Sequence, residues 1–449
     1  MRIRYRLLAL PVLAFAFAAA AGCSKIEPIT APAVHPGSAD FSRYVALGTS
    51  LAAGEESGAI VDRHQPYSYA ALFAGQIGVT LTHPNYPPEG LSVDGSTGIL
   101  HIQSLQPLVI VPSPPGAAPD VSAPNDYTNL GVLGAIVTDV IDSSTYYAPA
   151  RNNPHFAYVV RHRGLIAQAL GRLQPTFVSF EYGANELLGP ATSGAGAALI
   201  PPGTWAGYLH AALDAVQAAS APGAKMAIVN VPDPAMTPFA ATFSPIALDT
   251  TGAPVPLIGP GGTPLTPGAK VLLSAGALLA GGTGFPTNAR SYLTGAPGNG
   301  QPLPDQVVLT ESEVASLRAD LDQYNAAIAA EASARGAALV DFHALLADMA
   351  QNGFTYNGVR YTTAYVTGGL FGLDGVHPTD LGYGLIANRM IDAVNAKFGS
   401  TIAHVDLARV IGNRSDRAQP AHVSGLPLIV DGPAYYARMF GSPAGLPAP

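Results

Sequence analysis

The sequence predicts an α/β fold built around a parallel, doubly wound sheet. Between about residues 41 and 400, short apolar segments typical of buried strands alternate with longer segments whose apolar residues recur at helical spacing. The predicted strands are residues 44–47, 175–182, 224–231 and 338–341. Because a predicted helix lies between successive strands, the strands are expected to run in the same direction.

The predicted helices are residues 66–77, 161–173, 205–219, 310–335 and 381–398. The first carries a proline in its opening turn, where no intrahelical N–H is required. The fourth opens with Thr310 and Glu313 at the spacing of a capping box and ends at Gly336. Residues 126–142 have the pattern of a strand, a turn and a helix.

Three stretches interrupt this alternation, in a chain with 49 glycines and 41 prolines. Residues 84–125 predict a long excursion or a loop that carries a hairpin. Residues 235–304 predict an insertion on the edge of the sheet where the carboxyl ends of the strands open, and loops at that edge commonly carry function. Residues 401–449 form a Pro/Gly-rich tail to which the sequence assigns no element. Residues 41–400 are thus the predicted folded domain.

The composition excludes some classes of partner. Of the 449 residues, 48% are hydrophobic and 12% are charged, and the formal net charge is −8. No basic block is present, which argues against nucleic acid as a partner. The low charge has two interpretations: a genome rich in Gly, Ala and Pro codons, or a surface that meets lipid or apolar substrate.

The N-terminus predicts export and lipidation. Arg2, Arg4 and Arg6 precede an apolar segment, residues 7–21, that is short for a membrane span of about 20 residues. The following Ala-Gly-Cys23-Ser resembles a bacterial lipobox, which implies a signal peptide over 1–22 and acylation of Cys23. Residues 23–40 would then be a tether in the cell envelope, on the outer membrane if Ser24 acts as the sorting residue. The alternative is an ordinary secretory signal.

Ser50, Asp374 and His377 are candidates for acyl-transfer chemistry. Ser50 follows the first strand at its carboxyl end, where a hydroxyl is exposed for attack. Asp374 stands three residues before His377 in a turn, so its carboxylate can orient the imidazole as a general base. The alternatives are that Ser50 and His377 merely cap the helices that follow them. Cys23 is the only cysteine, so no internal disulfide can form.

Asn185 and Gly134 are candidates for oxyanion stabilisation. Asn185 lies in a Gly-x-Asn turn directly after the strand at 175–182, where its amide can point into the same cleft. Gly134 follows another predicted strand and can present a backbone N–H. The alternative for Asn185 is a plain turn in which it adopts a left-handed conformation.

The order of these four segments resembles the SGNH/GDSL hydrolase superfamily, with Ser50, Gly134, Asn185 and His377 at the four named positions. The resemblance spans about residues 44–398. It implies a flavodoxin-like three-layer α/β/α sandwich, hydrolysis of carboxylic esters or thioesters, and no metal or organic cofactor. It also implies a triad completed by Asp374 and an oxyanion hole from the N–H groups of Ser50 and Gly134 and the Asn185 amide.

Two positions depart from the family pattern, because Thr49 and Glu186 stand where aspartate is usual. The expected substrate is an acyl lipid or similar ester, favoured by the apolar 235–304 segment and the membrane tether. A polysaccharide O-acetyl esterase is the alternative enzyme. A surface lipoprotein that binds without catalysis is the alternative from another class.

Overall fold

The computed structural model describes residues 34–105, 108–122, 126–149, 151–412 and 428–429. The chain divides after His35, and the elements below belong to residues 36–449. The predicted signal peptide, Cys23 and residues 23–33 of the predicted tether lie outside the described residues. No described helix combines the length and apolar character that crossing a membrane requires.

The central sheet is wholly parallel, as predicted. Its strands are β1 (Tyr44–Gly48), β4 (Asn129–Gly131), β5 (Phe177–Phe180), β6 (Lys225–Val229) and β11 (Ala338–Val340), in the spatial order β11-β6-β5-β1-β4. Counted along the chain and read from β4, this is the 2-1-3-4-5 order of flavodoxin-like folds. The order reverses between β1 and β5, so a crevice is expected at the carboxyl ends of these two strands.

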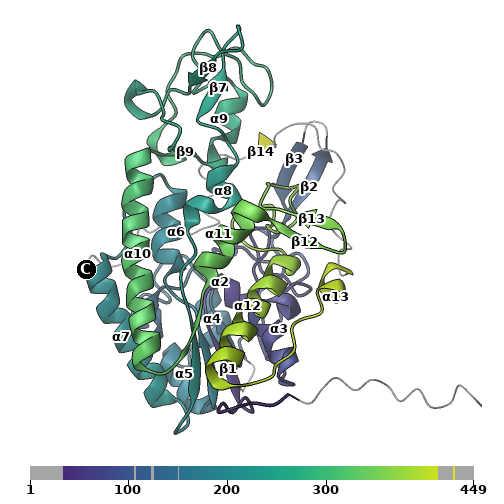
Figure 1. The fold of residues 1–449 in the computed structure, drawn as a ribbon, viewed down its shortest axis with the longest axis vertical. Coiled ribbons are helices and arrows are strands. Elements are labelled where there is room, and N and C mark those ends of the chain that lie inside the picture. Colours follow the sequence, from purple (N-terminus) through teal and green to yellow (C-terminus); the bar gives the residue numbers. More distant parts are fainter. Residues whose placement is uncertain (1–33, 106–107, 123–125, 150, 413–427, 430–449) are drawn as a thin grey trace, which may run out of the picture. The chain divides into compact units, whose positions relative to one another are not determined.

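Helices cover both faces of the sheet (Figure 1). On one face lie α3 (Tyr69–Gln76) and α12 (Asp380–Phe398), where Phe73 of α3 packs on Tyr44 and Phe177 at centroid distances of 5.2 and 5.8 Å. The alternate strand residues Val45, Leu47, Val178 and Phe180 join the opposite core. That core is covered by α5 (Ile166–Leu173), α7 (Pro202–Ala219) and α10 (Glu311–Ala334). Every residue of β1, β4 and β5 is buried, so these strands are covered on both faces, whereas Leu339 of the edge strand β11 is exposed.

Most predicted elements agree with the observed ones to within a few residues, but the helix predicted at 161–173 begins only at Ile166, because Arg161 ends α4 in a left-handed conformation. The capping box is present: the Thr310 hydroxyl accepts from the Glu313 N–H, and Glu313 accepts from the Thr310 N–H at 2.7 Å. The helix predicted near residue 137 is a 3₁₀ turn (Val137–Val140). Among the helices that were not predicted are α4 (His155–Val160), α6 (Ala184–Thr192) and α11 (Phe342–Asn352). Short helices α2 (Ser50–Ala53) and α8 (Pro238–Ala241) lie near the carboxyl ends of β1 and β6.

The long excursion after α3 carries a hairpin, one of the two predicted possibilities. Strands β2 (Leu100–Leu105) and β3 (Leu108–Pro112) pair antiparallel, and β14 (Leu428–Ile429) pairs with β3. The described part of the C-terminal tail also contains α13 (Leu407–Gly412), which packs on α12. A second hairpin, β12 (Phe354–Tyr356) and β13 (Val359–Tyr361), follows α11.

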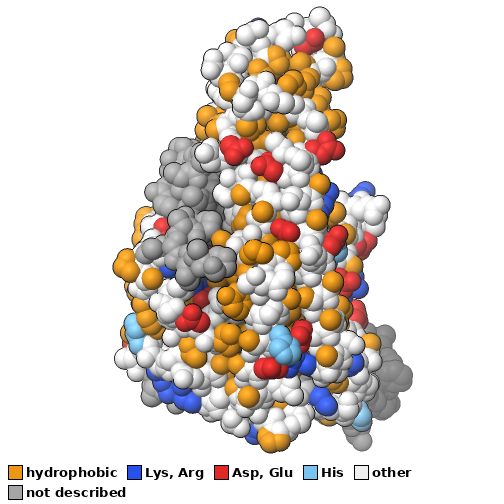
Figure 2. Space-filling model, turned by 90° about the vertical axis from the view of Figure 1, so that its left-hand side faces the viewer, with side chains coloured by type: hydrophobic (Ala, Val, Ile, Leu, Met, Phe, Trp, Pro, Cys, Tyr) orange, Lys and Arg blue, Asp and Glu red, His pale blue; other side chains and the backbone are white. Residues whose placement is uncertain are grey.

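The insertion at 235–304 follows β6, at the edge of the sheet where the sequence placed it. It contains the short pair β7 (Ile246–Leu248) and β8 (Pro254–Pro256), helix α9 (Gly276–Ala280), and β9 (Lys270–Val271), which pairs with β10 (Val308–Leu309). Its only charged residues are Asp249, Lys270 and Arg290. Accordingly, the upper part of the molecule in Figure 2 shows mainly hydrophobic and uncharged side chains.

Candidate active site

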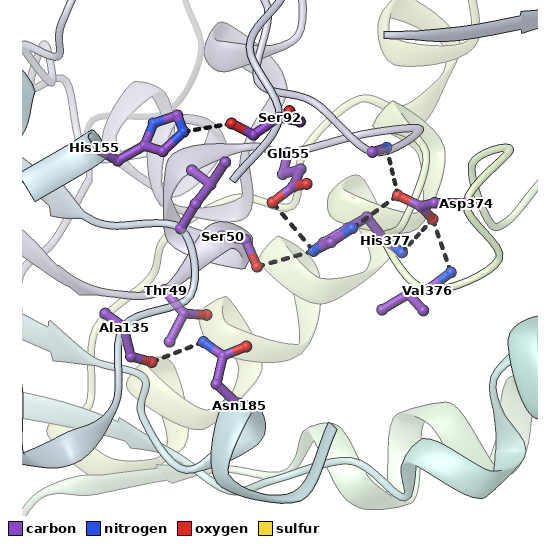
Figure 3. Close-up of polar contacts among 12 residues, drawn as sticks. Thr49, Ser50, Glu55, Ser92, Ala135, His155, Asn185, Asp374, Val376 and His377 are labelled. Carbon is purple, nitrogen blue, oxygen red and sulfur yellow. Dashed lines mark hydrogen bonds and ion pairs between the residues drawn. The ribbon is translucent and has the colours of Figure 1, made fainter. Parts of the chain in front are cut away.

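Ser50 lies where β1 meets α2, at the carboxyl edge of the sheet. Its side chain is buried, with 5% of the residue exposed. The residue in the N-cap position of α2 is Thr49, not Ser50, and Thr49 makes no side-chain capping bond. The Ser50 hydroxyl is instead bonded to His377 (Figure 3), so the interpretation of Ser50 as a helix cap is wrong.

Asp374 and His377 lie in the tight turn that precedes α12. The fully buried carboxylate of Asp374 accepts four hydrogen bonds. Oδ1 accepts from the N–H groups of Val376 and His377, both at 2.8 Å, and Oδ2 accepts from Gly58 N–H at 2.6 Å and faces His377 Nδ1 at 2.8 Å. Burial by itself would raise the pKa of Asp374, but His377 and these donors hold it below its ordinary value. These contacts therefore favour the ionised form of Asp374.

His377 connects Asp374 to Ser50. Its Nε2 lies 2.9 Å from Ser50 Oγ, although the two residues are 327 positions apart in the sequence. With a proton on Nδ1 shared with Asp374, Nε2 is left as the acceptor for the serine proton. The α12 cap is Thr379, whose hydroxyl accepts from Gly382 N–H, so the interpretation of His377 as a helix cap is also wrong.

Glu55 is a fourth polar group at this position, and the sequence analysis did not identify it. Its Oε2 lies 3.4 Å from His377 Nε2, the same ring nitrogen that contacts Ser50 (Figure 3). Only 2% of the residue is exposed, and its Oε1 has no hydrogen-bond partner among the described residues. The sequence signal was an acidic residue directly after the Gly54 that ends α2.

Asn185 is the second residue of α6, at the carboxyl end of β5. Its Nδ2 donates to the carbonyl of Ala135 at 2.7 Å, which leaves the second amide hydrogen for another acceptor. The left-handed residue in this turn is Gly183, with φ of 112°, rather than Asn185. A Cβ there would lie 2.8 Å from Val231 and 2.9 Å from Trp205, so the turn requires glycine.

Gly134 lies in the turn after β4, with φ of 66°. It directly precedes Ala135, the residue that holds the Asn185 amide. Unlike Ser50, Asn185 and His377, however, Gly134 is not among the described residues that line the cleft. The structure therefore places Asn185 in the cleft with Ser50. Gly134 lies outside the lining, next to Ala135, whose carbonyl binds the Asn185 amide.

The cleft beside Ser50 is mainly apolar and has an empty volume of about 730 Å³, part of it open solvent. Its polar lining residues are Thr49, Ser50, Asn185, Thr237 and His377. The walls come from α6, α11, α12, the segment after β6 and the loop before α12. The apolar lining residues are Leu51, Ala184, Leu188, Pro232, Pro234, Phe342, Leu345, Leu346, Met349, Phe371, Val376, Pro378 and Ile386. Such a cleft fits a hydrocarbon chain whose polar end reaches Ser50.

Comparison with known proteins identifies the family. The family profile described as GDSL-like Lipase/Acylhydrolase matches residues 44–390. The chain belongs to this family. Its general chemistry is therefore ester hydrolysis. No curated protein matches the sequence.

Two solved structures are similar to this GDSL-like chain. One is phospholipase A1 from Streptomyces albidoflavus NA297, at 15% identity over 79% of this chain and 98% of that chain, with a TM-score of 0.30. The other is the extracellular lipase from Streptomyces rimosus, at 15% identity over 78% of this chain and 98% of that chain, with a TM-score of 0.33.

The two departures from the GDSL pattern are both built into buried hydrogen bonds. Thr49 donates its N–H to Glu181 at 2.9 Å and its hydroxyl to the same carboxylate at 3.0 Å. Glu186 accepts from Val137 N–H at 2.8 Å and Trp205 Nε1 at 2.9 Å. Burial raises the pKa of both glutamates to about 7, although the hydrogen bonds that they accept act to lower it. Both departures are thus accommodated by buried hydrogen bonds; Thr49 also lines the cleft, and Glu186 does not.

Two groups of side chains in this GDSL-like domain have the composition of a metal site. They are Glu55, Asp374 and His377, and a neighbouring buried group of Glu56, His64 and Asp380. In the second group His64 Nδ1 lies 2.9 Å from Asp380, and Glu56 accepts from Asp380 N–H at 3.1 Å. Hydrogen bonds, together with the ion pair between Glu55 and His377, account for the proximity of the members of each group.

Proposed function

We propose that the protein is a carboxylic ester hydrolase in which Ser50 is the nucleophile, His377 the general base and Asp374 the group that orients it. The observation that carries this proposal is the unbroken line of contacts from Ser50 Oγ to His377 Nε2, 2.9 Å, and from His377 Nδ1 to Asp374 Oδ2, 2.8 Å. These are hydrogen-bond distances of the kind that proton transfer from a nucleophile needs.

In the proposed reaction His377 takes the Ser50 proton as Oγ attacks the ester carbonyl carbon. The tetrahedral intermediate carries its negative charge on the former carbonyl oxygen, which the Asn185 amide and the Ser50 N–H stabilise. Gly134, the third donor that the family resemblance implies, is not among the described residues that line the cleft and is left out of this proposal. His377 then gives its proton to the leaving alcohol. A water molecule, deprotonated by His377, repeats the attack on the acyl-enzyme and releases the acid and free Ser50.

The proposed substrate is an ester of an aliphatic acyl chain. The support is the cleft, in which thirteen of the eighteen lining residues are apolar. A sugar ring would need hydrogen-bonding side chains along the cleft wall, and these are scarce among the described lining residues.

The test begins with a fluorophosphonate probe, which should label the wild-type protein and neither Ser50→Ala nor His377→Ala. Each variant should lose most of the turnover, because the three side chains act as a unit. Rates on p-nitrophenyl esters should rise from acetate to medium-chain acyl groups. Release of acetate from acetylated glycans, with no chain-length preference, would favour the O-acetyl esterase. A folded wild-type protein that the probe does not label would favour a binding lipoprotein.

We also propose that Cys23 is acylated and anchors the protein in the cell envelope at the outer membrane. The support is the basic N-terminus, the apolar segment 7–21 and the placement of the only cysteine directly after them. Cys23→Ser should release the protein from the membrane fraction. Unchanged fractionation would indicate an ordinary secretory signal.

A further inference from the structure

Glu55 is placed beside His377 by its backbone. Gly54 ends α2 in a left-handed conformation, with φ of 87°, and the Glu55 N–H donates to the Ser50 carbonyl at 3.0 Å. On the other side the Tyr383 hydroxyl of α12 donates to the Glu55 carbonyl at 2.6 Å. The residue is therefore held between the segment that carries the nucleophile and the helix that follows the histidine.

Ser57 and Gly58, close after Glu55 in the sequence, contact the turn that carries Asp374 and His377. Ser57 Oγ accepts from Leu373 N–H at 2.9 Å, and Gly58 N–H donates to Asp374 at 2.6 Å. With Glu55 these contacts fix residues 55–58 against the turn that carries Asp374 and His377. The Glu55 carboxylate therefore reaches His377 Nε2 from a rigid support.

The hydrogen bonding of Glu55 does not resemble that of a structural residue. Its Oε1 is buried with no hydrogen-bond partner among the described residues, and its Oε2 has the imidazole as neighbour. A buried carboxylate with an unpartnered oxygen opposes folding. Glu181 accepts from the Thr49 N–H and hydroxyl, and Glu186 Oε1 accepts from two N–H donors, although Glu186 Oε2 is likewise unpartnered among the described residues. Glu55 differs from both in that the neighbour of its Oε2 is a titratable imidazole. The placement of Glu55 is thus better explained by its effect on His377.

We propose that Glu55 is a positioning residue that stabilises the imidazolium form of His377 and thereby sets the lower pH limit of activity. The inference rests on the proposed function of Ser50 and His377. When His377 takes the Ser50 proton, the new Nε2–H lies between Ser50 Oγ, 2.9 Å away, and the Glu55 carboxylate, 3.4 Å away. An ionised Glu55 favours this charge in the transition state, and also in the resting enzyme at pH values between the raised pKa of Glu55 and that of His377.

The direction of the pH effect follows from the groups around Glu55. Burial raises the pKa of Glu55, which the facing His377 partly offsets. Burial lowers the pKa of His377, but Glu55 and Asp374 raise it more, so it lies above its ordinary value of 6.5. The other facing groups are Tyr86, Tyr383 and Glu181, and the pKa values of both tyrosines are raised well above 10. Above the raised pKa of His377 the imidazole is neutral and can act as a base.

The test compares Glu55→Gln with the wild type over pH 5 to 10. The variant should shift the acid limb of the kcat/KM profile, and the NMR titration of the His377 imidazole, to lower pH by about one to two units. It should be faster than the wild type between about pH 7 and 8, where Glu55 is ionised and the wild-type His377 is still protonated. It should be about tenfold slower near pH 9, because the transition-state imidazolium loses its partner. If the pH profiles of Glu55→Gln and the wild type have the same acid limb, the proposal is overturned.

Glu56→Gln is the matched control, because Glu56 is the adjacent buried glutamate and faces His64 and Asp380 instead of His377. Its acid limb should coincide with that of the wild type. Glu55→Met tests the same point without a hydrogen-bonding group, and both Glu55 variants should melt no lower than the wild type at pH 8. Unfolding of both would make Glu55 a structural residue and overturn the proposal.

The two proposals fail in different ways. If the wild type neither hydrolyses esters nor reacts with the fluorophosphonate probe, the proposed function fails, while the His377 titration still reports whether Glu55 pairs with the imidazole. If the wild type is labelled and active but both the titration and the acid limb are unmoved in Glu55→Gln, only the role of Glu55 is refuted.

Discussion

Asp374→Asn tests the proposed triad most sharply, because its effect can be worked out from the four hydrogen bonds that the carboxylate accepts. An amide has one oxygen and one NH₂ group, so NH₂ must replace either Oδ1 or Oδ2. At the Oδ1 position the NH₂ group would face the backbone N–H groups of Val376 and His377, which can only donate hydrogen bonds. At Oδ2 it would meet Gly58 N–H and the His377 ring, and the ring can respond.

The expected response is a change of tautomer. If the amide NH₂ donates to His377 Nδ1, the ring proton moves to Nε2, which then points at Ser50 Oγ and Glu55. Nε2 can no longer accept the serine proton, so kcat should fall about 10⁴-fold, or ~5.5 kcal/mol in the activation free energy. The amide NH₂ would also face the Gly58 N–H, so two donors would lie against each other. This contact should lower the free energy of unfolding by about 1–3 kcal/mol.

The assay is kcat on a p-nitrophenyl ester, with thermal melts to establish that the variant is folded. Asp380→Asn is the matched control: Asp380 is also buried and lies 2.9 Å from His64 Nδ1, outside the cleft. Its kcat should stay within tenfold of the wild type. A folded Asp374→Asn protein whose kcat is within tenfold of the wild type would refute the assignment of Asp374 as the orienting group.

Three further predictions concern other parts of the site. Asn185→Ala should lower kcat by about 10²–10³ with little change in KM, because the amide acts on the oxyanion. Met349→Trp should shift the preferred p-nitrophenyl ester to a shorter acyl chain, because Met349 lines the apolar cleft. Glu186→Gln should stabilise the protein at high pH. The pKa of Glu186 is about 7 when folded against an ordinary 4.5, so the folded state loses stability as pH rises between these values. The gain in the free energy of unfolding should reach about 3 kcal/mol by pH 8 and vanish near pH 4.

Each of these predictions has its own check. Steady-state kinetics test Asn185→Ala, and an unchanged kcat would remove Asn185 from the oxyanion hole. An unchanged chain-length profile in Met349→Trp would mean that the acyl chain lies elsewhere. For Glu186→Gln, urea unfolding of the variant and the wild type at pH 4, 6 and 8 gives the comparison. A stability difference that does not grow with pH would contradict the ionisation of a buried Glu186.

The sequence determined the parts of this protein that depend on neighbouring residues. Strand and helix order follow from apolar periodicity, and the start of α10 follows from Thr310 and Glu313, because capping involves residues three apart. Ser50 and the Asp374–His377 turn were likewise identified from short segments, and the structure brings them together at one cleft. The family match over residues 44–390 agrees with this local information.

Only the tertiary structure decided which distant groups meet. The order of the strands, the use of α6 and α11 as cleft walls, and the pairing of Thr49 with Glu181 involve segments separated by more than a hundred residues. Glu55 looked like an ordinary polar residue after a glycine, because nothing within its own segment records that His377 lies 3.4 Å away. Such contacts arise from how the sheet and helices pack, and they set the charge balance at the histidine.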